Sequence, residues 1–539
     1  MSSSAKCCVL ILGATIVAAA LRLPRLAQRP MHGDEAIHAE KLGQLLEDGY
    51  YRYDPHEYHG PTLNYLTLIG AWLGSARNLT QVTEVTLRIV PVFLGLLLVL
   101  LPLLVLDGLG RTAAACAAFL TAISPAMVFY SRYYIMEMLL VCFTFGAMVC
   151  GYRYARSRNL AWALLTGAFL GLMHASKETC VIAAGSMLLA LLLVLWTARR
   201  ADRSALDAIR AVKPWHFIAG LAAAAVVSTL FYSSFFSHPE GILDSVRTYA
   251  TYLGRAGHSP LHIHPWYYYL RILLYFRYGT GPAWSEAFIV LLAVAGCVVA
   301  VSKRGLSGSD LSLLRFVALY ALIMTVIYSA IPYKTPWCLL GFLHGMILLA
   351  GVGAAAMIQL APNVLARTVV LVLLAASGGH LAWQAYLANY VYYADSRNPY
   401  VYAHPTTEVF TVANRVQELA QAHPDGRDID IQVICPGRDY WPLPWYLRSF
   451  RRVGWYQEVP ADEPFAPVII ISPSVEAALT KKLYDETPLE SRQMYMYLFD
   501  KPYYVWLRPK VKLVGLVRKD LWERFQQRQR EAGLPQFQR

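Results

Sequence analysis

Charged residues are scarce in this sequence. They make up 15% of its 539 residues, whereas hydrophobic residues make up 56%. A typical soluble chain has about 25% charged residues, so this chain has too few polar groups to cover a surface in water. The composition excludes a string of ordinary soluble domains and predicts an α-helical polytopic membrane protein.

The cysteines lack the spacing of a metal site or of a disulfide framework. None of the nine belongs to a C-x-x-C pair, and all but Cys435 lie in or beside apolar runs. This pattern signals neither structural zinc nor a set of disulfide bonds.

The net charge is +13, but the basic residues are not distributed as in a nucleic-acid-binding surface. The basic residues gather in short loops between apolar runs, at 153–158, 199–213 and 303–304, as the positive-inside rule expects of cytoplasmic loops. We therefore expect membrane lipids around the chain and no nucleic-acid partner. The same rule predicts a plasma (inner) membrane protein with a cytoplasmic N-terminus and an extracytoplasmic C-terminal segment.

About eleven apolar runs approach the length that crosses a bilayer. We expect them to form the transmembrane helices of a module covering residues 1–387, with an uncleaved first span. Pro91 and Pro102 interrupt the second run. The runs lie at roughly 7–21, 88–106, 112–130, 138–152, 160–175, 179–197, 215–233, 286–301, 313–331, 337–358 and 367–387.

Two stretches of this module are too polar to span and are expected to form outer loops, at 22–87 and 234–285. The first predicts a helix at the membrane surface after Asp34, because apolar residues recur there at helical spacing. These residues are Ala36, Ala39, Leu42, Leu45 and Leu46.

The remaining residues, 388–539, are enough for one small domain. The apolar runs at 429–435 and 467–474 predict buried strands, and helical patterns follow at 475–485 and 519–530. We expect a small extracytoplasmic α/β domain.

The first outer loop holds an adjacent pair of carboxylates, Asp34 and Glu35, at the start of the predicted helix. Helix-start amides favour an ionised carboxylate, and an ionised carboxylate at the membrane rim is suited to act as a general base. The alternative from these residues alone is a helix-capping Asp34 beside a solvated Glu35.

Three short outer loops each contain a single cation: Arg132, Lys177 and Lys334. The predicted topology places them on the same face as Asp34. Cations facing a carboxylate at the lipid boundary suit a lipid-phosphate substrate, because they hold the phosphate and stabilise the charge it gains on leaving. The alternative is that they are ordinary interface anchors.

At the level of motifs, the sequence resembles the GT-C superfamily of polytopic glycosyltransferases, and within it the protein O-mannosyltransferase-like branch of bacteria and archaea labelled "flippase activity-associated". The resemblance rests on stretches that run from the first loop into the C-terminal segment. They are HGDEAIHA at 32–39, YRYDPHEYHGP at 51–61, YSR at 130–132, SKE at 176–178, PWYYYL at 265–270, KTPW at 334–337 and DYWPLPWYLR at 439–448.

The resemblance implies transfer of a sugar from a polyprenyl-phosphate donor to an acceptor hydroxyl with inversion. It implies that Asp34 is the catalytic base and that Glu35 helps to place the acceptor. The phosphate would be bound by Arg132, Lys177 and Lys334, and His59 with Glu178 would complete the substrate site. The acceptor would be a lipid, a glycan or a protein.

A required metal is a weaker alternative. His32, Asp34 and His38 offer nitrogen and oxygen ligands, with His56 and His59 nearby. The loop has no D-x-D pair, and relatives of the protein mannosyltransferase type work without a metal. We therefore expect no required cofactor and no metal site.

Two functions of other classes remain open from the sequence. One is a lipid-linked glycan transporter or flippase component. Transporters tend to have internal repeats and ionisable residues at mid-membrane, whereas the charges of this chain lie at span ends and no internal repeat is visible. The other is a non-catalytic membrane scaffold, against which the intact Asp34–Glu35 pair argues.

Overall fold

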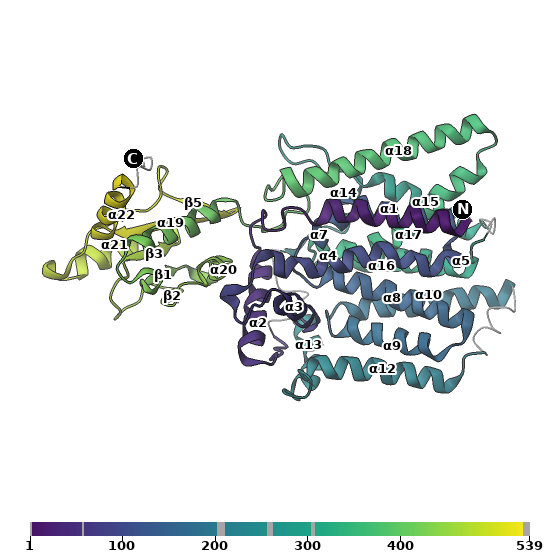
Figure 1. Cartoon of the computed structure of the whole chain (residues 1–539), viewed down its shortest axis with the longest axis horizontal. Coiled ribbons are helices and arrows are strands. Elements are labelled where there is room, and N and C mark those ends of the chain that lie inside the picture. The colour runs from purple at the N-terminus through teal and green to yellow at the C-terminus, as the bar shows by residue number, and fades with distance from the viewer. Residues whose placement is uncertain (1–2, 57–58, 202–210, 256–261, 303–307, 532–539) are drawn as a thin grey trace.

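The chain folds into a helical bundle with a small α/β domain at one end (Figure 1). The computed structural model describes residues 3–56, 59–201, 211–255, 262–302 and 308–531. The N-terminus lies at the opposite end of the bundle from the α/β domain. Most of the basic loop at 199–213, and Lys303 with Arg304, fall outside the described residues.

Each predicted apolar run coincides with a helix or, in one case, with two. Among the described residues, eight helices are long and apolar enough to cross a membrane, and α6 with α7 makes a ninth if it counts as one bent span. Because α9 and α15 are apolar but shorter, the exact number of spans stays a prediction. The helices are α1 (Ser3–Arg22), α4 (Glu84–Leu100), α6 (Arg111–Ile123), α7 (Pro125–Ser131), α8 (Glu137–Ser157), α9 (Leu160–His174), α10 (Cys180–Ala201), α12 (Pro214–Tyr232), α15 (Ala287–Val301), α16 (Leu311–Ala330), α17 (Leu340–Leu360) and α18 (Val364–Tyr386).

Helices α6 and α7 meet at an angle of 60°. Pro125 has no N–H group and its ring obstructs the preceding turn, so it ends α6. The Ser124 hydroxyl accepts the Met127 N–H at 3.4 Å and caps α7. Arg132 follows directly at the end of α7.

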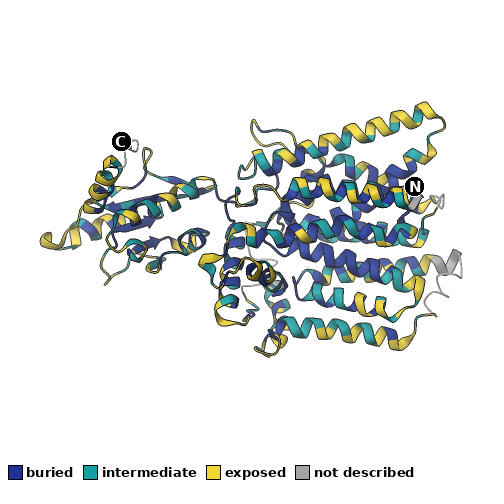
Figure 2. Cartoon of the chain, in the orientation of Figure 1, coloured by how far each residue is buried: buried dark blue, intermediate teal, exposed yellow. Residues whose placement is uncertain are grey.

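Helices α8 and α17 are largely buried in the bundle, whereas α12 and α18 lie at its edges and expose apolar side chains (Figure 2). Small residues allow the closest contacts. A Cβ on Gly353 of α17 would lie 2.1 Å from the Leu292 carbonyl oxygen of α15, and one on Gly167 of α9 would lie 1.9 Å from that of Gly220 in α12.

The two outer loops contain helices of their own. The predicted helix after Asp34 is α2 (Gly33–Asp48), and α3 (Thr62–Leu73) follows in the same loop. The second loop contains α13 (Gly241–Arg255) and α14 (Tyr268–Leu274). The sequence did not predict α3, because its twelve residues are too few for a span.

The C-terminal domain contains a six-stranded sheet with β2, β1, β3, β6 and β4 in order and β5 paired with β6. The predicted strands are β1 (Ile431–Ile434) and β3 (Val468–Ile471), which pair in parallel. The predicted helices are α21 (Glu476–Lys481) and α22 (Lys519–Glu531). The elements not predicted are α19 (Glu408–Ala422), α20 (Leu443–Leu447), β2 (Val453–Tyr456), β4 (Tyr495–Tyr497), β5 (Val505–Arg508) and β6 (Val511–Arg518).

The segment between α18 and α19 returns to the bundle. Helix α18 ends in a π-helical turn at Leu387–Val391. Tyr400 then packs into the hydrophobic core of the bundle, and His404 is buried. The α/β domain is therefore joined to its end of the bundle by packed residues as well as by the chain.

Candidate active site

The candidate site is built around the first turn of α2. His32 caps this helix: its Nδ1 accepts the Asp34 N–H at 3.0 Å, and its backbone N–H donates to Glu35 Oε2 at 3.0 Å. The structure thus gives the capping role to His32 rather than to Asp34. The Asp34 side chain is 46% exposed, so its carboxylate is reachable.

The expectation of a solvated Glu35 is wrong. Glu35 is fully buried, and Arg88 of α4 donates to both of its oxygens, at 2.8 and 2.7 Å. The Tyr134 N–H donates a further hydrogen bond at 2.9 Å. Burial by itself would raise the pKa of Glu35, but the charge and hydrogen bonds of Arg88 outweigh it and hold this pKa below its ordinary value.

These contacts define what Glu35 does. A carboxylate that accepts four hydrogen bonds from within the protein has no position left for an acceptor. Arg88 also donates to the carbonyls of Leu26 and Arg29, at 2.6 and 2.9 Å, in the segment that leads into α2. The pair thus ties the start of α2 to α4 and to the segment before it, and the prediction that Glu35 helps to place the acceptor stays untested.

Arg132 is buried, and its side chain contacts groups of the protein itself. It is 5% exposed, and its guanidinium donates to carbonyls of residues 21–25 and, at 3.0 Å, to the Tyr390 hydroxyl. The guanidinium also lies 4.7 Å from the centre of the Tyr390 ring. These contacts satisfy the carbonyls at the end of α1. In this structure the contacts of Arg132 are those of a structural residue, and its role in phosphate binding stays a prediction.

Lys334, like Arg132, is buried and donates hydrogen bonds to backbone carbonyls. It is 1% exposed, and its Nζ donates to the carbonyls of Ile331 and His264. Its backbone N–H donates to the His262 carbonyl at 2.9 Å. Lys334 thus joins the loop after α16 to the second outer loop, and the structure does not support a phosphate-binding role for it.

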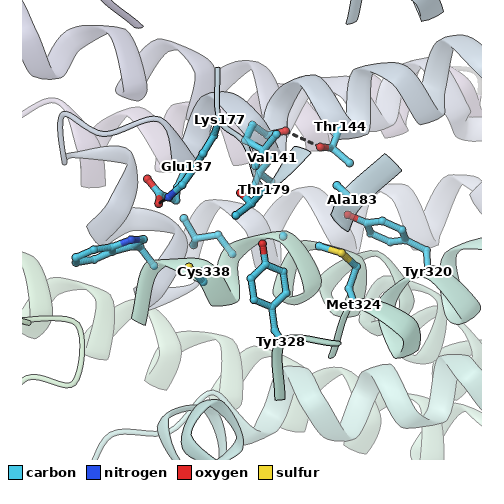
Figure 3. Close-up of a pocket in the computed structure, with 14 residues that line it drawn as sticks. Glu137, Val141, Thr144, Lys177, Thr179, Ala183, Tyr320, Met324, Tyr328 and Cys338 are labelled. Atoms are coloured by element: carbon cyan, nitrogen blue, oxygen red, sulfur yellow. Dashed lines mark hydrogen bonds and ion pairs between the residues drawn. The ribbon is translucent and has the colours of Figure 1, made fainter. Parts of the chain in front are cut away.

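Lys177 is the predicted cation that faces a cavity. It follows α9, and its Nζ contacts the carboxylate of Glu137, the first residue of α8. Both side chains line a pocket between α8, α10, α16 and α17 (Figure 3). The rest of the lining is mainly apolar or aromatic: Leu140, Val141, Thr144, Thr179, Ala183, Tyr320, Met324, Tyr328, Trp337, Cys338, Leu340 and Gly341.

His59 and Glu178, predicted from separate motifs, form a pair. His59 Nδ1 lies 2.7 Å from Glu178 Oε2, and the Tyr53 hydroxyl donates to Glu178 Oε1 at 3.3 Å. Burial alone would raise the pKa of Glu178, but His59 and Lys177 lower it below its ordinary value. The ring of His38 lies 6.1 Å from that of His59, so the pair adjoins α2.

The metal alternative gains no geometric support. Among the described residues, no three His, Cys, Asp or Glu side chains converge as a metal site would require. His32 is committed as the helix cap, and its Nε2 lies 3.1 Å from the Tyr402 carbonyl. That no metal is required stays a prediction.

The C-terminal domain touches the same helix start. The Met31 N–H donates to the Tyr446 hydroxyl at 2.8 Å, and Trp445 Nε1 donates to Glu84 of α4 at 2.8 Å. A Cβ on Gly33 would lie 3.6 Å from Cβ of Trp441. The stretch at 439–448, one of those on which the resemblance rests, thus packs against the segment that leads into α2.

The sequence reasoning missed the partners of the acidic residues. Arg88 lies inside an apolar run, where an ionisable residue signals a partner, and that signal was available. Glu137 gave no such signal, because only the folded bundle brings α8 to Lys177.

Comparisons with known proteins agree on the fold. The family described as dolichyl-phosphate-mannose-protein mannosyltransferase matches residues 69–238, about a third of the chain. No curated protein matches the sequence.

The similar solved structures include two polyprenyl-phosphate complexes. ArnT from Cupriavidus metallidurans bound to undecaprenyl phosphate has a TM-score of 0.58 at 15% identity, covering 95% of this chain and 98% of that one. Archaeal oligosaccharyltransferase AglB from Archaeoglobus fulgidus, in complex with an inhibitory peptide and a dolichol-phosphate, has a TM-score of 0.55 at 13% identity, covering 96% and 76%.

An apo structure of the Archaeoglobus fulgidus oligosaccharyltransferase has a TM-score of 0.56 at 14% identity and covers 83% of this chain; the match spans 64% of that chain, under two thirds of its length. The chain thus has the fold of the GT-C polytopic glycosyltransferases, as the motifs predicted. The flippase-associated branch is not confirmed.

Proposed function

We propose that this protein is a membrane glycosyltransferase that transfers a sugar from a polyprenyl-phosphate donor to an acceptor hydroxyl, with inversion, on the extracytoplasmic face. The fold supports the class of enzyme. Undecaprenyl phosphate and dolichol-phosphate occupy two structures of the same fold, which supports the class of donor.

The observation that carries the proposal is the position of Lys177 in an apolar pocket near α2. The ammonium of Lys177 has three hydrogens to donate, and Glu137 neutralises it while no phosphate is bound. A phosphate would share this ammonium, and the apolar lining suits the first isoprenoid units of the lipid.

Asp34 supplies the base. It takes the proton of the acceptor hydroxyl as that oxygen forms a bond to the anomeric carbon. The bond from this carbon to the phosphate oxygen breaks, and its electrons leave with the polyprenyl phosphate, whose new charge Lys177 stabilises. A single displacement places the acceptor opposite the leaving phosphate and inverts the anomeric centre. No second carboxylate is needed, because the phosphate leaves without protonation.

The position of the site favours the outer face of the plasma membrane. Helix α2, which begins at the candidate site, and the C-terminal domain lie at one end of the bundle, and the N-terminus lies at the other (Figure 1). The arginines at 153–158 lie in the last turns and at the C-cap of α8, whereas its first residue, Glu137, lies at the end that holds the site. The positive-inside rule then makes the N-terminal end cytoplasmic. The acceptor remains a lipid, a glycan or a protein.

Binding of undecaprenyl monophosphate to the purified full-length protein tests the donor assignment. Loss of one charge-assisted hydrogen bond costs about 1.5–3 kcal/mol, so Lys177→Ala should weaken binding roughly 10- to 100-fold. Arg153→Ala, which removes an exposed cation paired with Asp107, is the matched control and should bind normally. Absence of saturable binding by the folded wild type would overturn the proposal.

A further inference from the structure

A buried histidine near Asp34 has no assigned role. His38 lies one turn after Asp34, so the two side chains share a face of α2. It is 4% exposed, and its Nδ1 has no hydrogen-bond partner among the described residues. A ligand with a hydroxyl group would satisfy this nitrogen.

The surroundings of His38 connect the base to the lipid-phosphate site. Its ring is 6.1 Å from that of His59, which Glu178 holds at 2.7 Å. It lies within electrostatic reach of both Asp34 and Lys177. In the proposed reaction the anomeric carbon forms a bond to the oxygen that Asp34 activates and loses the bond to the phosphate that Lys177 holds. On that mechanism the sugar ring lies near His38 and His59.

The protonation state of His38 suits hydrogen bonding to a hydroxyl group. Burial, with His59 and Lys177 nearby, lowers the pKa of His38 to about 3, so the imidazole is neutral at physiological pH. A neutral imidazole has one donor and one acceptor nitrogen, which matches the donor and acceptor character of a sugar hydroxyl. An isoprenoid chain offers neither group, and an ionised phosphate only accepts.

We propose that His38, together with the His59–Glu178 pair, forms a hydroxyl-binding site for the sugar of the donor and determines which sugar-lipid is preferred. This inference rests on the proposed function, because it needs a donor phosphate at Lys177. His38 contacts the sugar directly, whereas Glu178 acts through His59 and is a positioning residue.

The test compares two ligands on the same protein. One is undecaprenyl monophosphate, and the other is a panel of undecaprenyl-phosphate hexoses and pentoses. We expect the wild type to bind at least one sugar-lipid about tenfold more tightly than the bare lipid. In His38→Phe this ratio should fall towards one while affinity for the bare lipid stays unchanged. The conservative variant His38→Gln, which keeps a donor and an acceptor, should retain part of the preference.

Stability provides the second readout. Phenylalanine keeps an aromatic ring and has no unpaired polar atom, but it is larger than histidine. We expect removal of the unpaired nitrogen to offset the tighter packing, so His38→Phe should keep a Tm close to wild type while it loses the sugar preference. His344 of α17 is the matched control, because it is also 4% exposed with an unpaired nitrogen, Nε2, among the described residues. His344→Phe should likewise keep a Tm close to wild type and leave the preference intact.

The outcomes separate the two proposals. An unchanged ratio in folded His38→Phe and His38→Gln, or a wild type with no sugar preference at all, overturns the role of His38 while the lipid-phosphate site stands. Failure of the wild type to bind the bare lipid overturns the proposed function itself. If His38→Phe does not fold, the ratio in His38→Gln decides.

Discussion

Two buried ion pairs of the candidate site differ in what surrounds them. In the Arg88–Glu35 pair, both carboxylate oxygens accept hydrogen bonds from the guanidinium and from backbone N–H groups. In the Lys177–Glu137 pair, both residues line a pocket whose remaining walls are mainly apolar. The Arg88–Glu35 pair, the closed pair, thus has no hydrogen-bonding position left for a ligand, whereas the Lys177–Glu137 pair, the open pair, faces a pocket that a ligand can enter.

This contrast separates the charged residues of the site into those with a structural role and those that can bind a ligand. A buried charge that is fully hydrogen-bonded within the protein specifies structure, and removing one partner leaves an uncompensated charge. A buried cation facing a cavity can exchange part of its pairing for a substrate anion. By this criterion Arg132 and Lys334 belong with Arg88, whereas Lys177 stands apart.

The largest expected effect is that of replacing Asp34, the proposed base. Asp34→Asn should lower sugar transfer about 10²- to 10⁴-fold, the usual contribution of a general base. Because the side chain is 46% exposed, Tm and lipid-phosphate binding should stay close to wild type. Near-normal turnover in this variant would remove the assignment of the base.

Breaking the closed pair should affect folding more than binding. Arg88→Ala leaves Glu35 buried and unpaired, which costs about 3–5 kcal/mol and should lower Tm strongly. Arg153→Ala removes one partner of an exposed pair and should cost less than about 1 kcal/mol. Equal losses in the two variants would contradict the structural role of Arg88.

Acid provides a second probe of the same pair. The depressed pKa of Glu35 means that its contribution to stability is present above its ordinary pKa, about 4.3, and is lost as pH falls through the lower folded value. The wild type should therefore lose stability on acidification. Glu35→Gln, already lacking the charge, should show less of this loss in thermal melts across that pH range.

The open pair should respond in the opposite direction. Glu137→Gln removes the anion that competes with phosphate for Lys177, so affinity for undecaprenyl monophosphate should rise by about 1 kcal/mol, roughly fivefold. Arg132→Ala should lower Tm and leave the affinity of the folded protein unchanged. Weaker binding in Glu137→Gln would mean that Glu137 holds Lys177 in place for the phosphate.

The smallest expected effect is that of metal removal. Since no three ligand side chains converge among the described residues, EDTA should leave transfer unchanged. Loss of activity restored by a divalent cation would return His32, Asp34 and His38 to consideration as ligands.

The sequence by itself determined the class of protein and the location of its helices. Long apolar runs have to be helical in lipid, where backbone groups can be satisfied only internally, so each predicted run became a helix. Spacing after Asp34 likewise determined α2, and the buried runs determined β1 and β3. Half-exposed strands such as β2 carry no such pattern and were missed.

Only the tertiary structure decided which charged residues are available. Arg132, Lys177 and Lys334 look equivalent in sequence, each a single cation in a short loop. Their roles depend on what lies within 3–4 Å: carbonyls at the end of α1 for Arg132, loop carbonyls for Lys334, and a cavity for Lys177. Those neighbours come from residues distant in the chain, and hydrogen-bond energies act only at such short range, which is why no local pattern could reveal them.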